Sequence, residues 1–264
     1  MLHTRGVLMR IIDWNISYSG DTMPKIEYLL SLLSDEICVM LQEVKPHIYE
    51  YIRNAIGQNY HLLYSLNYRK PSNYDSGARK LGVLIIVSGE AIIKDAGVIE
   101  RSLFPDRTMY VSVDLNGTQY KLLALHSITG CDYKKAKSVQ FDTFSEFVDK
   151  YQPDVIGIDA NEPRFDHYDI SQMRFYDNGP GAKTFFETIE KNGLLDSYVA
   201  ANHITECTEG LPLITSHHIR RKGNVRYDFL FVKNHIKIER MEYQFDQAIS
   251  AGSDHALLLC DTAI

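Results

Sequence analysis

Residues 154–166 read DVIGIDANEPRFD, and the organisation of the whole chain can be argued outward from this stretch. Val155 to Ile158 are apolar or small, which predicts a short buried strand. The strand should end at Asp159 to Asn161, because Pro163 cannot donate to a sheet ladder. Asp159 and Asn161 are two positions apart, so their side chains should leave the strand end on the same side. This is a common mounting for reactive groups, although Asp and Asn also begin ordinary turns.

The composition is that of a globular protein with ample material for a core. The chain has 264 residues, of which 45% are hydrophobic, and its formal net charge is −6. A negative charge argues against tight, purely electrostatic binding to nucleic acid, but it does not exclude an enzyme that hydrolyses nucleic acid. No run of 18 or more apolar residues occurs, so no transmembrane helix is expected.

The cysteines and the first residues indicate the compartment. Cys38, Cys131, Cys207 and Cys260 are far apart and show no metal-type spacing. The N-terminal residues read as a first strand rather than as a signal peptide. We therefore expect a cytoplasmic protein in a reducing environment, without a membrane segment and monomeric.

Apolar runs along the chain predict roughly ten strands with helices between them. The dipeptide Asn116-Gly117 joins two such runs, 108–115 and 118–125, and predicts an antiparallel hairpin. The longest helix is expected over 133–151, and one strand over 225–232. No repeat and no Pro/Ser-rich linker interrupts the chain, so we expect a single α/β domain over residues 1–264. Its sheet should be mixed rather than uninterruptedly parallel.

Polar side chains of one chemical kind recur where these strands end. They are carboxylates, carboxamides and histidines, the set that binds a hard cation and handles phosphate: Asn15, Glu43, His126, Asp159, Asn161, and the triplet Ser253-Asp254-His255 before the last strand. Each has an ordinary alternative, namely a turn residue, a first-turn carboxylate, a satisfied core histidine or a cap. Asp228 lies in the apolar run RYDFLFV and needs a buried partner, which an arginine or a histidine would supply.

Taken together and in this order, the motifs resemble the endonuclease/exonuclease/phosphatase superfamily. They are WN (Trp14-Asn15), QE (Gln42-Glu43), a strand-end histidine (His126), DxN (Asp159, Asn161), YDFLF (227–231) and SDH (253–255). The superfamily includes deoxyribonuclease I, abasic-site endonucleases, sphingomyelinases and inositol-polyphosphate 5-phosphatases. The resemblance spans residues 10–260 and implies a four-layer sandwich of two packed mixed β-sheets flanked by helices. It specifies metal-dependent phosphoester chemistry well and the substrate poorly.

The resemblance also implies a metal site. Glu43 matches the glutamate that ligates the metal in the family, and Asn15 matches the asparagine that supports metal and phosphate. Asp254 is a second ligand or an outer-shell group. One carboxylate plus waters suits Mg²⁺, with Mn²⁺ as an alternative.

The remaining motif residues match the groups that act on the phosphate. Asp159 matches the aspartate that orients or deprotonates the attacking water, while Asn161 and His126 match phosphate contacts. His255 matches the catalytic histidine, and Asp228 the carboxylate that fixes its tautomer and stabilises its charged form.

The chain departs from the family in two places. The usual Gly-Asp-Phe/Met-Asn signature reads Gly157-Ile158-Asp159-Ala160-Asn161, with one extra residue before the aspartate. Abasic-site endonucleases often carry Asp two residues after the WN asparagine, and Ser17 stands there instead. The second departure weakens an abasic-site assignment.

Two basic segments are candidates for contact with a polyanion, or else are solvated loops. The first combines Arg69, Lys70, Arg79 and Lys80 with Tyr68 and Tyr74, and the second contains His217, His218, Arg220, Arg221, Lys222 and Arg226. Mixtures of basic and aromatic residues suit phosphate contacts and base stacking.

The sequence thus predicts a Mg²⁺-dependent phosphodiester hydrolase, and within that class a nuclease cleaving DNA or RNA. A phospholipid or small-molecule phosphoesterase is the first alternative, but no hairpin of clear apolar character is evident. A catalytically inactive binding module is the second, and the presence of every expected catalytic residue argues against it.

Overall fold

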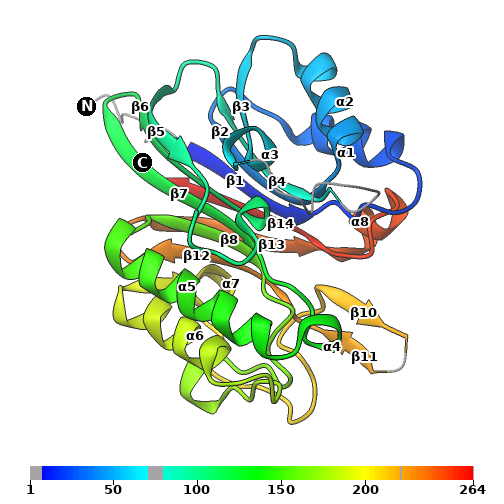
Figure 1. The fold of residues 1–264 in the computed structure, drawn as a ribbon, viewed down its shortest axis with the longest axis vertical. Helices are drawn as coiled ribbons and strands as arrows, with labels where there is room; N and C mark the ends of the chain where they lie inside the picture. The colour runs from blue at the N-terminus through cyan, green and yellow to red at the C-terminus, as the bar shows by residue number, and fades with distance from the viewer. Residues whose placement is uncertain (1–7, 71–79, 221, 264) are drawn as a thin grey trace.

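The computed structural model describes residues 8–70, 80–220 and 222–263. Two six-stranded sheets lie face to face, and helices cover the outer face of each sheet (Figure 1). Each sheet holds one parallel pair, β1 with β2 and β7 with β8, among antiparallel neighbours. The predicted four-layer sandwich of mixed sheets is therefore confirmed.

The first sheet joins the two ends of the chain. Its order is β13-β14-β1-β2-β4-β3, and the strands are β13 (Lys237–Gln244), β14 (Leu257–Ala263), β1 (Leu8–Asn15), β2 (Ile37–Val44), β4 (Gly82–Ser88) and β3 (Tyr60–Tyr64). Three helices cover it, α1 (Met23–Leu32), α2 (Pro46–Ile56) and α8 (Phe245–Ser250). Isoleucines at four-residue spacing in α2, Ile48, Ile52 and Ile56, face this sheet because that spacing puts them on one side of a helix.

The second sheet carries the opening stretch of sequence near its centre. Its order is β5-β6-β7-β8-β12-β9, with β5 (Ile92–Gly97), β6 (Thr108–Leu115), β7 (Thr118–His126), β8 (Val155–Asp159), β12 (Asp228–Lys233) and β9 (Leu194–Asp196). Helices α5 (Lys135–Tyr151) and α6 (Gly181–Lys191) pack on its outer face through a phenylalanine-rich layer, Phe141, Phe144, Phe185 and Phe186.

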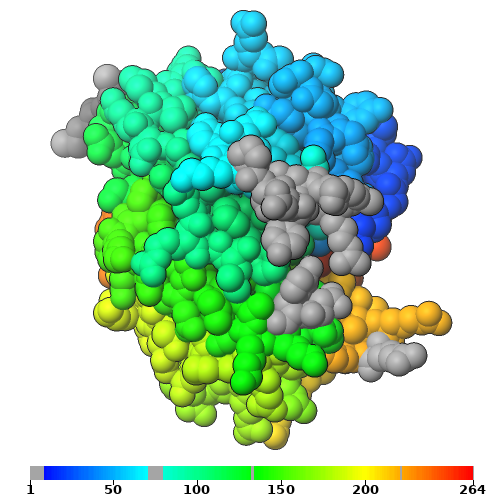
Figure 2. Space-filling view, in the orientation of Figure 1, coloured from blue at the N-terminus to red at the C-terminus, as the bar shows by residue number. Residues whose placement is uncertain are grey.

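Smaller elements fill the connections. They are α3 (Ser65–Tyr68), α4 (Gly130–Tyr133), α7 (Ser197–Asn202), the 3₁₀ turns at Pro105–Arg107 and Ile170–Gln172, and the separate hairpin of β10 (His217–Ile219) with β11 (Gly223–Val225). The hairpin projects from the body of the molecule (Figure 2). No helix among the described residues is long and apolar enough to cross a membrane.

Gly157 brings the two sheets unusually close at one point. A Cβ built on Gly157 would collide with the carboxylate of Asp13 and with the sulfur of Met40 from the facing sheet. Asp13 lies fully buried there and accepts a hydrogen bond from Gln42 Nε2 at 2.7 Å. A glycine at position 157 is therefore required for β1 to pass directly over β8.

The strand expected over 225–232 is interrupted, and the interruption has a local cause. The Ser216 hydroxyl accepts hydrogen bonds from the backbone N–H groups of Tyr227 at 2.8 Å and Asp228 at 3.1 Å. The segment consequently divides into β11 and β12, and Asp228 opens β12 instead of lying in mid-strand. The expected helix over 133–151 is likewise divided, because Lys134 has a positive φ of 45° between α4 and α5.

Candidate active site

Three neighbouring strands of the second sheet carry a polar side chain at the same edge of the sheet. His126 of β7 stands opposite Asp159 of β8, and Asp159 stands opposite Asp228 of β12. All three residues are almost completely buried. The row forms because β7 and β8 run in parallel and end together, while antiparallel β12 begins at the same edge.

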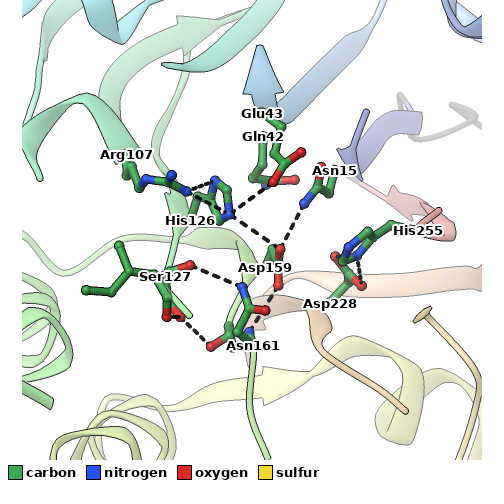
Figure 3. Close-up of polar contacts among 12 residues, drawn as sticks. Asn15, Gln42, Glu43, Arg107, His126, Ser127, Asp159, Asn161, Asp228 and His255 are labelled. Carbon is green, nitrogen blue, oxygen red and sulfur yellow. Dashed lines mark hydrogen bonds and ion pairs between the residues drawn. The ribbon is translucent and has the colours of Figure 1, made fainter. Parts of the chain in front are cut away.

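The first sheet supplies the opposite wall. Asn15 ends β1 beside Gln42 of β2, Glu43 follows Gln42, and His255 lies two residues before the start of β14. The Asn15 side chain spans the two sheets and donates from Nδ2 to Asp159 Oδ2 at 2.9 Å. Figure 3 shows side chains from both sheets converging on one centre. The seven motif residues that the structure brings together there are Asn15, Glu43, His126, Asp159, Asn161, Asp228 and His255.

His255 and Asp228 form a buried pair. The Nδ1 atom of His255 lies 2.9 Å and 3.1 Å from the two oxygens of Asp228. Burial alone would lower the pKa of His255, but the carboxylates of Asp228 and Asp159 outweigh it and raise that pKa to about 10. The imidazole is therefore charged at neutral pH. Asp228 contacts Nδ1, so Nε2 is the ring nitrogen that can donate to another group. The sequence expectation that Asp228 needs a buried partner is met by a histidine.

The ring of His255 is also fixed from the backbone side. Its carbonyl accepts from Trp14 Nε1 at 3.2 Å, and its amide donates to Ser253 Oγ at 3.1 Å. Ser253 Oγ in turn donates to the carbonyl of Asn15 at 2.8 Å. The serine of the SDH triplet thus links the backbone of His255 to the end of β1.

Asp159 is the most constrained carboxylate of the group. Oδ1 accepts from the backbone N–H of Asn161 at 3.0 Å, and Oδ2 accepts from Asn15. Burial first, and then the nearby Asp228 carboxylate, raise the pKa of Asp159 to about 7. A carboxylate with that pKa exchanges a proton readily near neutral pH. The Asn161 contact is the ordinary Asp-turn bond allowed by the sequence, so the turn and the site coexist.

Asn161 leaves the strand in a left-handed backbone conformation with φ of 50°. Asparagine tolerates this region better than most residues. Two contacts hold it: Nδ2 donates to the carbonyl of Ser127 at 3.1 Å, and its own carbonyl accepts from Lys137 Nζ at 2.6 Å. Because an amide carries two N–H donors, one remains for a ligand.

Glu43 is turned into the site by a break in the pairing of β2 with β4. The register of that pair shifts between Leu41 and Val44, and Glu43 has a positive φ of 60°. Such bulges re-aim a side chain at the edge of a sheet, and a left-handed glutamate is a form of local strain often found at functional sites. The Glu43 carboxylate accepts from the backbone N–H of Tyr18 at 3.0 Å, not from the start of α2.

The turn that holds Glu43 is anchored by a buried lysine. Lys25 of α1 is fully buried and donates from Nζ to the carbonyl of Ser17 at 2.8 Å and also to the carbonyl of Ser19. The N–H of Ser17 donates to Asn15 Oδ1 at 3.0 Å. One turn, Ser17 to Ser19, therefore orients both Asn15 and Glu43.

His126 is neutral and faces a cation that the sequence analysis did not identify. Nη1 of Arg107 lies 2.8 Å from Nδ1 and 3.0 Å from Nε2 of His126. Burial, together with the Arg107 charge, holds the pKa of His126 well below its ordinary value. The two-residue turn at Asn116-Gly117 sets the register of β6 against β7. In that register Thr108 pairs with Leu125, so Arg107 lies beside His126.

Two groups of described residues bring three metal-type ligand atoms within 4.8 Å of one another. They are Asp159 with Asp228 and His255, and Asp254 with His217 and His255. Asp254 is exposed, and its carboxylate belongs to the histidine side of the site. Glu43 is in neither group, so it offers a single carboxylate, 18% exposed, next to the Asn15 amide. That donor set fits Mg²⁺, which keeps several of its waters.

The expected phosphate patch at 217–226 is only partly accessible. Arg220 is exposed at the tip of the β10–β11 hairpin. Arg226 is buried and donates to Asp196 at 2.6 Å, so its assignment to a phosphate-binding surface is wrong. Arg226 lies in the break between β11 and β12, where Asp166 and Asp196 hold its guanidinium inside the protein. Arg79 and Arg221 lie outside the described residues.

Comparisons with known proteins identify the fold through structure. No family model matches the sequence, and no curated protein matches it. A solved structure of the 3′ phosphatase NExo from Neisseria, bound to a product DNA hairpin, is similar with a TM-score of 0.67 at 18% identity, covering 97% of this chain and 100% of that one. D. rerio TDP2 complexed with a single-strand DNA product has a TM-score of 0.66 at 14% identity, covering 97% and 99%.

A third similar structure carries the family name. It is an endonuclease/exonuclease/phosphatase family protein from Bacteroides thetaiotaomicron, with a TM-score of 0.63 at 13% identity, covering 98% of each chain. This chain therefore has the endonuclease/exonuclease/phosphatase fold, as its motifs indicated.

Proposed function

We propose that this protein is a divalent-metal-dependent phosphodiester hydrolase that cleaves DNA or RNA. One observation carries the proposal. A proton-exchanging carboxylate, Asp159, and a charged imidazole, His255, meet between the ends of the two sheets, beside the single carboxylate of Glu43. Similar folds have been solved with DNA products bound, which supports nucleic acid as the substrate.

Asp159 receives a proton from the attacking water in this proposal. Its pKa of about 7 leaves a large fraction ionised at neutral pH, and such a carboxylate is a competent general base. Asn15 donates to Oδ2 and so fixes the direction of the carboxylate without protonating it. The second N–H of the Asn161 amide donates to a phosphate oxygen.

His255 stabilises the charge that builds up on the phosphate. Its imidazolium is held by Asp228 through Nδ1, so Nε2–H is the donor that faces the reacting group. Asp228 keeps the ring oriented and compensates its charge, as in other His–Asp pairs. Arg107, which contacts the neutral His126, adds a second positive charge next to the same centre.

Glu43 and Asn15 would hold the metal ion, and the Ser17–Ser19 turn would orient both. The bound ion would polarise a phosphoryl oxygen and neutralise developing charge. Mg²⁺ is the proposed ion, with Mn²⁺ as a replacement.

The exposed hairpin favours a polyanion over a lipid as the substrate. Lys222, Arg220 and His218 are exposed on or next to the β10–β11 hairpin, and a basic hairpin suits phosphates better than acyl chains. The cytoplasmic location and monomeric state expected from the sequence remain part of the proposal.

A substrate panel tests the function. The purified chain with Mg²⁺ should cleave supercoiled plasmid, single-stranded DNA or RNA and should leave sphingomyelin and inositol phosphates intact. Addition of EDTA should abolish cleavage, and Mg²⁺ or Mn²⁺ should restore it. The variant Asp159→Asn, prepared in parallel, controls for contaminating nucleases. Cleavage that persists in EDTA, or turnover of lipid or inositol phosphate alone, would contradict the proposal.

A further inference from the structure

The loop that follows Asn161 folds back on itself and presents an aromatic ring. Arg164 and Phe165 donate their backbone N–H groups to the carbonyl of Arg174 at 2.8 Å and 3.0 Å, and Arg174 N–H donates to the carbonyl of Phe165 at 3.1 Å. These bonds make a short antiparallel bridge between residues 165 and 174. The bridge holds the backbone of Arg164 and Phe165 next to that of Arg174.

Phe165 is exposed and is flanked by two arginines. Phe165 is 42% exposed, whereas phenylalanine side chains are ordinarily buried. The guanidinium carbon of Arg164 lies 5.3 Å from the centre of the ring, and that of Arg174 lies 5.9 Å from it. Both distances are within the range of cation–π contact.

Both guanidinium groups keep their charge available. Neither Arg164 nor Arg174 has a carboxylate within ion-pair distance among the residues the structure describes. The two carboxylates nearest to Arg164 along the chain both have other partners. Glu162 lies 2.9 Å from Lys137, and Asp166 accepts from the N–H of Leu213 at 2.9 Å and lies 3.7 Å from Arg226. Two positive charges therefore stand uncompensated beside an exposed ring, on a chain whose net charge is −6.

The surroundings extend this surface toward the site. Arg164 and Phe165 line a hollow together with Leu211, which is 60% exposed, and with Asn224 of β11. On the inner side, Lys222 lies 4.4 Å from the ring centre of Tyr176, whose hydroxyl is 2.7 Å from that of Tyr227 next to Asp228. The β10–β11 hairpin and the bridged loop are thus neighbours, since both contribute residues to this hollow.

The distance to the reacting phosphate is limited by the chain itself. Phe165 follows Asn161 by four residues, so their Cα atoms are separated by at most about 14 Å. A strand of nucleic acid whose phosphate is bound by Asn161 therefore reaches Phe165 within a few nucleotides.

We propose that Arg164, Phe165 and Arg174 form a docking platform for an unpaired stretch of nucleic acid next to the scissile phosphate. This inference rests on the proposed function and adds the strand state of the substrate. Unpaired bases stack on aromatic rings and on guanidinium planes, whereas the bases of a duplex are already stacked on one another. The two unpaired arginines bind the phosphates on either side of the stacked base.

Binding to oligonucleotides of defined strand state tests the platform. Fluorescence anisotropy in EDTA, which prevents turnover, measures Kd for a labelled single strand and for a duplex of the same length. Phe165→Ala should raise Kd for the single strand about tenfold, since one stacked base is lost. Arg164→Ala/Arg174→Ala should weaken it further and should reduce the slope of log K against log salt by about 1.4, or 0.7 for each lost phosphate contact.

Arg53→Ala/Arg240→Ala is the matched control. It removes the same charge from two exposed arginines that are paired with Glu50 and Glu242, and Arg53 also lies over an aromatic ring, that of Tyr49, at 5.8 Å. This control should leave both Kd values and the salt slope unchanged. Circular dichroism and thermal unfolding verify that all variants are folded.

Hydrolysis separates failure of the platform from failure of the function. With Mg²⁺, Phe165→Ala should raise KM on the single-stranded oligonucleotide and leave kcat/KM on bis(p-nitrophenyl) phosphate, which has no neighbouring nucleotides, unchanged. Wild-type protein that cleaves no nucleic acid overturns the proposed function and the platform together. Wild-type cleavage with unaltered Kd and KM in the platform variants overturns the platform alone. Equal weakening of single strand and duplex overturns the single-strand assignment.

Discussion

Two buried clusters of the same charge pattern lie side by side in this protein, and only one belongs to the site. In the first, Asp159 and Asp228 surround the imidazole of His255. In the second, Asp166 and Asp196 surround the guanidinium of Arg226. Arg226 and Asp228 are only two residues apart in the chain. Each cluster places two carboxylates around one cation.

The two clusters differ in whether their cation can release a proton. Arg226 donates from Nε to the Tyr243 hydroxyl at 3.0 Å and from Nη2 to Asp196, and it packs on the ring of Phe229 at 4.4 Å. A guanidinium does not lose its proton in proteins. His255 commits one ring nitrogen to Asp228 and keeps the other, and imidazole does titrate. The same electrostatic pattern is therefore fixed in one place and able to exchange protons in the other.

The largest expected effect comes from replacing the titrating cation. His255→Gln retains an N–H that can reach Asp228 but has no transferable charge, so kcat should fall by about 10²- to 10⁴-fold. Steady-state kinetics on the substrate found in the panel measures the loss. Unfolding by urea should show a much smaller change for this variant than for Arg226→Met. Turnover near the wild-type level would remove His255 from the reaction.

The fixed cation should act on stability instead. Arg226→Met leaves Asp166 and Asp196 buried without compensation, which costs about 3–5 kcal/mol of unfolding free energy. Urea denaturation followed by circular dichroism measures it, with Arg226→Lys as the charge-retaining control. A variant that unfolds like the wild type would mean that the second cluster is not a structural ion pair.

Titration sharpens the comparison further. The folded state raises the pKa of Asp159 from its ordinary value of 3.8 to about 7, so it favours the protonated carboxyl. The resulting stability is present below the unfolded pKa and is lost as the pH rises through about 7. Relative to Asp159→Asn, wild-type protein in EDTA should therefore lose about 2–4 kcal/mol of unfolding free energy between pH 4 and 7. A constant difference between the two proteins over that range would contradict the raised pKa.

A third buried cation, Lys25, should give the smallest effect of the four. It anchors the turn that orients Glu43 and Asn15, so Lys25→Met should weaken metal binding about tenfold, as loss of an outer-shell contact commonly does. Terbium luminescence measures binding without turnover. Lys183→Met, which breaks an exposed pair with Glu187 on α6, is the control. Unaltered terbium affinity in Lys25→Met, with only a lowered melting temperature, would limit Lys25 to a structural role.

The sequence predicted those parts of the site that depend on local pattern. Asp159, Glu43 and His255 stand at strand ends, and strand ends can be recognised from hydrophobic runs. Arg107 was predictable in principle, because the register of a two-residue hairpin extends along both strands.

Other features depend on packing that no local pattern encodes. The ammonium of Lys25 folds back onto two carbonyls of the Ser17–Ser19 turn, and the bulge at Glu43 is visible only in the pairing of β2 with β4. Arg226 lies in a run of basic residues, and such a run predicts a surface position. Its burial follows from Asp166 and Asp196, which are distant in the sequence.

The pairing of β1 with β14 has a consequence for the protein while it is being made. Trp14 and His255, 241 residues apart, are hydrogen-bonded, and β14 supplies the antiparallel neighbour of β1. On the ribosome β1 emerges before β14, so β1 remains an edge strand until β14 follows. The Asp159 carboxylate and the His255 imidazole cannot meet until that edge is filled. The candidate site is therefore assembled only after β14 has been translated.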